Sequence, residues 1–244
     1  MMSRSNFKER GAAQFESGRI TQASIAEEGR SMLSSLAPVQ KYPPSIELFK
    51  QGCPAQDVYL VEHGLVKLMR LCDEGRSLIL GLRPSGWVLG ASSVILQKPY
   101  PASAITVTNC HLRRILATSF IELLKTSSQF SLYFNQLQSR EIYDQIGHQV
   151  GLGFHSARHR LEQLLWQLIY THKLNDPQQR EFQKEMRLNL PLKHNEIADL
   201  IAVTPEHLSR VMKQMQQEGF LRREKGWIII SDLQKLQPVP DLYY

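Results

Sequence analysis

Apolar residues that recur at every second position predict a run of short strands between about residues 45 and 116. This spacing is seen at Val58/Leu60, Val66/Leu68 and Leu78/Leu80/Leu82. Alternation with period two is typical of strands that bury one face. Glycines punctuate the run at intervals of 11 or 12 residues, at Gly52, Gly64, Gly75 and Gly86. Turn signals at this spacing predict an antiparallel sandwich or barrel, with a hairpin turn at Asp73–Gly75.

The segment ahead of the strands has a different character. Residues 1–30 are polar and carry few periodic apolar positions, which predicts a flexible lead-in. A short helical patch over Met32–Leu36 follows and ends before Pro43. The chain contains no run of ~18 apolar residues that could span a membrane, and charged residues interrupt any secretory signal near its start. We therefore expect a cytoplasmic protein that does not associate with membranes.

Helical periodicity takes over beyond residue 115. Ser119 and Glu122 have the spacing of a capping box and predict a short helix over 120–125. A long helix is predicted over about 129–151, ended by the Gly-Leu-Gly at 151–153, and Ser156 can cap the next helix. The apolar residues of the long helix fall roughly along one face, at Phe130, Phe134, Leu137, Ile142, Ile146 and Val150. So apolar a helix must pack against its own β-domain, a second copy or both, and we expect a dimer seam.

Residues 190–230 carry the most informative pattern. Asn195–Ile201 predicts a short helix, and Thr204 and Pro205 predict the start of a second, since Thr can cap the first N–H groups and Pro needs none. The second helix has an apolar face at Leu208, Val211, Met212 and Met215. Its opposite face is polar, at Glu206, Ser209, Arg210 and Lys213. Two helices joined by so short a turn predict a helix-turn-helix over 195–214.

A basic hairpin is predicted directly after these helices. Leu221–Arg223 and Trp227–Ile230 flank a Glu-Lys-Gly turn, an arrangement called a wing, and the charges near its tip, Arg222, Arg223 and Lys225, are placed to meet phosphates. A polar helix face alone is usually just exposed to solvent and has no binding role. The polar face, the capped helix and the basic wing together predict DNA readout. The net charge of +6 permits this function without establishing it.

These segments resemble the CRP/FNR family of bacterial transcription regulators over about residues 35–236. The helix-turn-helix matches at EIADLIAVTPEHLSRVMKQM, and the β-domain matches at residues 48–68 and in the GWVLG turn at 86–90. The resemblance implies an α+β fold with an N-terminal cyclic-nucleotide-binding-type β jelly roll over 31–126, a long dimerisation helix over 127–152, a winged helix-turn-helix domain over 153–236 and a tail over 237–244. It also implies a homodimer on a palindromic site in double-stranded DNA, with RNA polymerase as a further partner.

The resemblance extends to the residues that would read bases. A common pattern in the family has Glu followed three and four residues later by Ser and Arg, as at Glu206, Ser209 and Arg210. Arg210 can donate two parallel hydrogen bonds to guanine, Glu206 can accept from a cytosine amine, and Ser209 can touch a thymine or a phosphate. Pro205 stands where another family pattern has an arginine, so that guanine contact should be absent. Phosphate or flanking contacts are expected from Thr204, His207, Lys213, Arg222, Arg223 and Lys225.

The resemblance also locates a vestigial effector cassette, formed by Gly90, Ala91, Ala102 and Ser103. Ala91 and Ala102 align with the Glu and Arg that hold the ribose and phosphate in the cyclic-AMP-binding branch. Because alanine offers neither charge nor hydrogen bond, we expect no response to cyclic AMP. The iron–sulfur branch needs four thiolates, but this chain has three cysteines and none in residues 1–52. We expect no cofactor, while an unidentified small-molecule effector stays open.

Three alternatives to this interpretation remain. A haem or zinc site could be built from Cys53, His63, Cys72, Cys110 and His111, although their spacing matches no ligand motif. In a different class, the chain could be a ligand-binding or interaction module whose helix-turn-helix only packs. An enzyme is disfavoured, because the sequence holds no Gly-rich phosphate loop, His-Glu-x-x-His, nucleophile elbow or paired-Cys motif.

Overall fold

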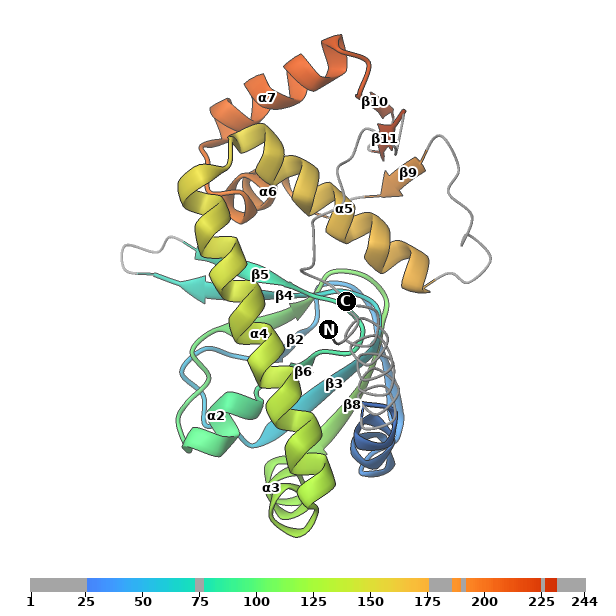
Figure 1. Ribbon diagram of the computed structural model, residues 1–244, viewed down its shortest axis with the longest axis vertical. Coiled ribbons are helices and arrows are strands. Elements are labelled where there is room, and N and C mark those ends of the chain that lie inside the picture. The colour runs from blue at the N-terminus through green and yellow to red at the C-terminus, as the bar shows by residue number, and fades with distance from the viewer. Residues whose placement is uncertain (1–25, 73–76, 176–185, 190–191, 225–226, 232–244) are drawn as a thin grey trace, which may run out of the picture.

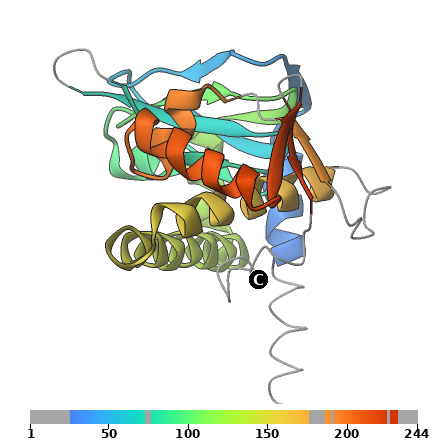
Figure 2. The ribbon, with the colours of Figure 1, turned by 90° about the horizontal axis from the view of Figure 1, so that it is seen from above.

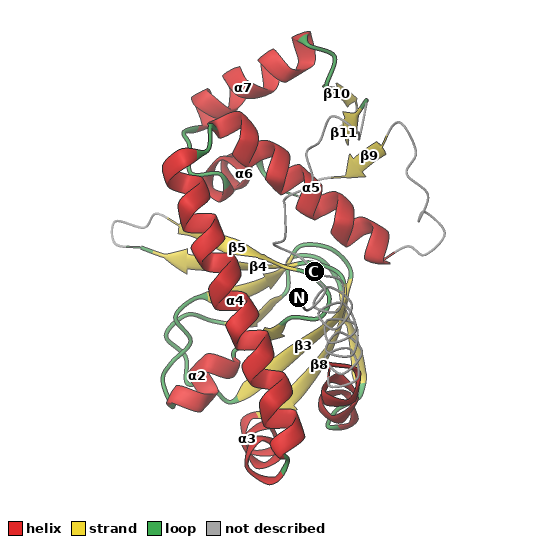
Figure 3. Ribbon diagram, viewed as in Figure 1, coloured by secondary structure: helices red, strands yellow, loops and turns green. Residues whose placement is uncertain are grey.

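A computed structural model describes residues 26–72, 77–175, 186–189, 192–224 and 227–231. The β-domain occupies one half of the molecule, and a domain of helices and a short sheet occupies the other (Figures 1 and 3). A long helix, α4 (Ser128–Phe154), runs along one side of the β-domain toward the smaller domain. Seen from above, this helix lies outside the sheets (Figure 2).

The β-domain is built from two four-stranded antiparallel sheets, in the orders β1-β8-β3-β6 and β2-β7-β4-β5. The strands are β1 (Val39–Tyr42), β2 (Glu47–Phe49), β3 (Asp57–His63), β4 (Val66–Leu71), β5 (Ser77–Arg83), β6 (Val88–Leu89), β7 (Ser103–Thr106) and β8 (Cys110–Leu116). In β3, Tyr59 and Val61 face the interior between the sheets, whereas Val58 and Leu60 face the helices. β3 is thus an inner strand of its sheet, between β8 and β6, and is buried on both faces.

The structure confirms the predicted sandwich of short strands. β3, β4 and β5 cover the three segments with period-two spacing. Gly64, which joins β3 to β4, has a φ of +99°, and a Cβ there would come 2.6 Å from the Asn109 carbonyl oxygen. Only glycine fits that turn without displacing backbone. The predicted hairpin turn at Asp73–Gly75 lies outside the described residues.

Helices cover the outer face of β3 and its neighbours. They are a helix over residues 26–35, α2 (Ala91–Leu96), α3 (Ala117–Thr126) and the first half of α4. Two expectations are wrong here. The capping box at Ser119 does not form, because α3 already begins at Ala117 and its N-terminal boundary residue, Leu116, makes no side-chain cap. Residues 26–30, expected in the flexible lead-in, are helical.

The long helix differs from its prediction in two ways. It continues through the Gly-Leu-Gly at 151–153 and ends at Phe154, so these glycines do not break it. Its apolar residues do not share one face. Phe130 and Phe134 are buried in the β-domain core, while Ile142, Ile146 and Val150 are 59%, 54% and 50% exposed. As predicted, Ser156 caps α5 (Ala157–Asn175) by accepting a hydrogen bond of 3.2 Å from the His159 N–H.

The two domains share an interface at the end of the β-domain. Leu65, Leu82 and Val107, all from the β-domain, belong to the same buried cluster as the core of the smaller domain. Beside them, Lys67 of β4 forms an ion pair with Glu196 of α6 (His194–Leu200), the first helix of the helix-turn-helix. Both side chains are 16% exposed, so the β-domain directly supports α6.

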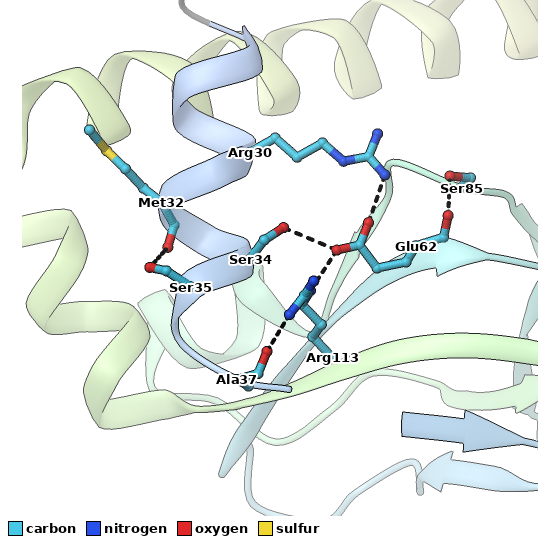
Figure 4. A network of polar contacts seen from close by, with 8 residues as sticks. All are labelled: Arg30, Met32, Ser34, Ser35, Ala37, Glu62, Ser85 and Arg113. Atoms are coloured by element: carbon cyan, nitrogen blue, oxygen red, sulfur yellow. Dashed lines mark hydrogen bonds and ion pairs between the residues drawn. The ribbon is translucent and has the colours of Figure 1, made fainter. Parts of the chain in front are cut away.

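Glu62 organises the contact between the N-terminal helix and the β-domain (Figure 4). Its carboxylate accepts hydrogen bonds from Arg30 (2.8 Å), Ser34 (3.0 Å) and Arg113 (2.6 Å), and its backbone carbonyl accepts one from Ser85 (2.7 Å). Burial alone would raise the pKa of this carboxyl, but the three hydrogen bonds outweigh it and lower the pKa. Glu62 is therefore ionised at neutral pH.

The depressed pKa makes Glu62 a source of pH-dependent stability. Its stabilising contribution is fully present above the ordinary pKa of 4.5 and is lost as the pH falls through the lower, folded-state value. Glu62→Gln should lower the free energy of unfolding by about 1–3 kcal/mol at pH 7 and by less near pH 4. Urea unfolding at several pH values measures this, with exposed Glu122→Gln as the control. An equal penalty at every pH would show that ionisation of Glu62 is not the cause.

Candidate nucleic-acid interface

The smaller domain contains two helices joined by a tight turn. α6 is followed by α7 (Pro205–Gln217), and the turn between them is closed by hydrogen bonds from the Ala202 and Val203 N–H groups to the Asp199 and Ala198 carbonyls, both 3.0 Å. Ala202 adopts the left-handed region with a φ of 51°. The chain thus reverses within a few residues and sets α7 against α6, as the helix-turn-helix prediction requires.

The beginning of α7 is formed as its sequence predicts. The Thr204 hydroxyl accepts a hydrogen bond of 3.2 Å from the His207 N–H, and Pro205 occupies the first helical position. At the beginning of α6, the Glu196 carboxylate accepts a hydrogen bond of 2.8 Å from the Lys193 backbone N–H. Glu196 therefore both starts α6 and pairs with Lys67 of the β-domain.

The two faces of α7 are sharply different. Its buried side chains are the four that the sequence predicts, Leu208, Val211, Met212 and Met215. The candidate contact residues Thr204, Glu206, His207, Ser209, Arg210 and Lys213 are all exposed. Within the described part of the chain, the Arg210 guanidinium makes no hydrogen bond, so its donors are available to a ligand outside the protein.

The exposed Glu206 is held ionised. Hydrogen bonds from its own backbone N–H and from the Thr204 hydroxyl, followed by the charge of nearby Arg210, lower the pKa of its carboxyl. The partial positive charge at the N-terminus of a helix also favours the ionised carboxylate. Glu206 is thus a pure hydrogen-bond acceptor, and Arg210, one turn further along, is a pure donor.

One residue that the sequence analysis did not single out contacts this face. The His194 Nε2 atom lies 3.0 Å from the Ser209 Oγ atom and 3.1 Å from the Pro205 carbonyl oxygen. His194 is the first residue of α6, so its ring links the two helices of the motif. A local sequence pattern could not have predicted this contact, because fifteen positions separate His194 from Ser209.

The wing is a three-stranded antiparallel sheet in the order β10-β11-β9. β10 (Leu221–Glu224) and β11 (Trp227–Ile230) form the predicted hairpin, and β9 (Met186–Asn189), which the sequence analysis missed, pairs with β11. Arg222 and Arg223 are exposed on β10. The third predicted tip charge, Lys225, lies outside the described residues.

The residues of the candidate effector cassette pack against neighbouring parts of the β-domain. Gly90 begins α2 with a φ of +83°, and a Cβ on it would come 2.9 Å from the Tyr100 ring. Ala91 and Ala102 are 1% and 4% exposed. The Ser103 hydroxyl accepts a hydrogen bond of 3.0 Å from the Gln51 backbone N–H. No side chain of the cassette therefore presents a charge to a phosphate.

The cysteines and histidines of the alternative metal site do not form a compact cluster. Cys53 and Cys72 are exposed, and Cys110 is fully buried. Burial raises the pKa of the Cys110 thiol, which donates a hydrogen bond to the Leu65 carbonyl and is therefore not a thiolate. His63 and His111 lie side by side, with ring centres 5.3 Å apart. Among the described residues, no three Cys, His, Asp or Glu side chains converge on a metal position.

Comparison with known proteins agrees with these two domains. Residues 39–127 match the family model of the cyclic nucleotide-binding domain, and residues 159–239 match that of the Crp-like helix-turn-helix domain. The cyclic AMP receptor protein of Thermus thermophilus is 24% identical over 81% of this chain and 86% of its own length. The transcriptional activator protein Anr of Pseudomonas aeruginosa is 26% identical over 76% of this chain and 73% of its own.

A solved structure supports the fold as well. FixK2 from Bradyrhizobium japonicum superposes with a TM-score of 0.65 at 22% identity, covering 82% of this chain and 95% of that one. A winged helix-turn-helix attached to a cyclic-nucleotide-binding-type β-domain defines a DNA-binding transcription regulator of α+β class. The chain belongs to the CRP/FNR family of such regulators. Across the described residues, no helix is sufficiently long and apolar to cross a membrane.

Proposed function

We propose that this regulator acts as a homodimer that reads a palindromic DNA site through α7 and needs no cyclic AMP to do so. The observation that carries the proposal is the exposed polar face of α7, where Glu206, Ser209 and Arg210 lie opposite a buried apolar face. A helix that served only to pack would be apolar on this side as well. The protein then works by binding, without catalysis.

The chemistry of this face suits one G·C pair in each half-site. Arg210 donates two parallel hydrogen bonds to guanine O6 and N7, and the ionised Glu206 accepts from the cytosine amine of the same or the next pair. Ser209 contacts a thymine or a phosphate. Thr204, His207, Lys213, Arg222, Arg223 and Lys225 hold the DNA backbone and make affinity fall with salt.

The exposed half of α4 supports the dimer. Ile142, Tyr143, Ile146 and Val150 recur at three- and four-residue spacing and are all at least half exposed. Two copies that pair these faces around a two-fold axis bury them and place two α7 helices on successive major grooves, about 34 Å apart. A palindromic site follows from that symmetry. RNA polymerase is the further partner in this proposal, because the Pseudomonas relative Anr is a transcriptional activator.

The cassette supports independence from cyclic AMP. Ala91 and Ala102 supply no partner for a ribose hydroxyl or a phosphate, and the Ser103 hydroxyl is already bound to the backbone of Gln51. An anionic nucleotide would have to give up its hydration without receiving a charged partner from these residues in return.

Selection of binding sites from random duplexes tests the proposal. We expect the effector-free protein to select a palindrome with a fixed G·C pair in each half-site. Addition of about 1 mM cyclic AMP, the upper end of typical KM values, should leave the affinity for DNA unchanged. Fluorescence anisotropy at two salt concentrations separates selected from sequence-blind binding. Weak, salt-sensitive binding without sequence preference, or tight binding only with cyclic AMP, would contradict the proposal.

A further inference from the structure

We propose that His194 is a positioning residue for DNA recognition, which keeps the Ser209 hydroxyl free to donate a hydrogen bond to DNA. This inference rests on the proposed function, because it assigns a role to Ser209 within the DNA-reading face of α7. It goes beyond that function by adding a residue from α6 that controls how one of the reading side chains is presented.

The geometry places the His194 ring between two groups of α7. Its Nε2 atom is 3.1 Å from the Pro205 carbonyl oxygen and 3.0 Å from the Ser209 Oγ atom. Pro205 and Ser209 are four residues apart and therefore lie one above the other on the same face of the helix. One ring nitrogen thus reaches both groups at hydrogen-bonding distance.

Chemistry fixes the direction of these contacts. A carbonyl oxygen can only accept, so the hydrogen must reside on Nε2 of His194, which acts as the donor. The Ser209 Oγ atom shares this N–H as a second acceptor. The hydroxyl hydrogen of Ser209 is consequently not used by His194, and it is left to donate elsewhere.

The alternative for a serine within a helix shows what His194 prevents. Such a hydroxyl commonly donates back to the carbonyl four residues earlier, which for Ser209 is that of Pro205. That carbonyl already accepts the Ser209 backbone N–H of the helix and the His194 N–H, and these two bonds occupy both of its lone pairs. With the Pro205 carbonyl occupied, the Ser209 hydroxyl hydrogen is free to turn toward the open side of the helix.

This arrangement has a consequence for recognition. With its hydrogen pointing outward, Ser209 can donate to thymine O4 or to a phosphate oxygen. Without the imidazole, the hydroxyl would turn back to the Pro205 carbonyl and present only an oxygen, which DNA acceptors repel. His194 therefore sets the donor character of Ser209 without reading a base itself.

A double-mutant cycle tests the inference on the selected operator and on its single-base variants. His194→Phe keeps the ring but removes the donor, Ser209→Ala removes the hydroxyl, and His194→Gln restores an N–H donor. We expect His194→Phe to reduce discrimination by ~2–10-fold only at the position that Ser209 reads, and to have no further effect in the Ser209→Ala background. His194→Gln should recover part of the discrimination.

Control measurements separate the possible failures. Gln216→Ala, an exposed polar change near the other end of α7, should alter neither discrimination nor thermal stability. Equal weakening by His194→Phe at every base pair, or the same loss with and without the Ser209 hydroxyl, would overturn the inference. So would a Ser209→Ala protein that discriminates normally. Failure of the proposed function itself would appear differently, as an Arg210→Ala protein with unchanged sequence preference.

Discussion

A chain carrying Ile146→Asp and Val150→Asp should be monomeric and should bind the palindromic site about 10²–10⁴-fold more weakly than the native protein. The two side chains are about half exposed in the single chain, so the substitutions remove little of its own core. In a two-fold interface each carboxylate would meet its symmetry mate across an apolar seam, where burying unpaired charge is costly. The dimer should therefore dissociate while each monomer stays folded.

Sedimentation velocity and DNA binding together check this expectation. The variant should sediment with the mass of one chain and bind an isolated half-site as well as the native protein does. Gln145→Asp also adds a negative charge to α4, one instead of two, but lies off the exposed apolar face, so that control should remain dimeric. A double variant that keeps twice the mass of one chain and full affinity would show that the seam lies elsewhere.

The long helix shows what a linear pattern can miss. The apolar pattern predicts Phe134 and Ile146 on roughly one face of the helix, but twelve residues at about 100° each turn the helix by three turns and a further 120°. The structure accordingly buries Phe134 against the β-domain and exposes Ile146. One part of α4 therefore packs against the protein's own β-domain, and another apolar part of the helix is exposed.

Contacts between near neighbours were predictable, because a single stretch of sequence contains both partners. The Thr204 cap bonds to His207 only three residues away, and the buried face of α7 follows from its own periodicity. The glycines at 151–153 were misleading for a related reason. Glycine weakens a helix by about 1 kcal/mol, which tertiary packing can outweigh, so α4 continues to Phe154.

Contacts between distant segments could not be predicted in this way. The ion pair of Lys67 with Glu196 joins residues 129 positions apart, and the network around Glu62 joins three separate segments. β9 is only four residues long and becomes a strand because β11 offers it an edge. These features depend on how the domains pack, and a single sequence does not record that arrangement.

Substitution of Arg210 should produce the largest change in base specificity. Arg210→Ala removes a bidentate guanine contact worth about 1–3 kcal/mol in each half-site, so two half-sites give a loss of roughly 30-fold to more than 10⁴-fold. The loss should be confined to the operator, since the G·C preference at one position disappears. Thermal stability should not change, because the side chain is exposed and makes no hydrogen bond within the described residues.

Two companion variants separate base readout from simple charge. Arg210→Lys keeps the positive charge but not the planar pair of donors, so it should retain salt-sensitive binding to any duplex and lose the G·C preference. Lys213→Ala should instead weaken binding evenly across sequences and lower the salt dependence by about one ion per contact. If Arg210→Ala unfolded the protein, the polar face of α7 would be a packing surface. Retention of the G·C preference in Arg210→Ala would mean that another side chain reads the guanine.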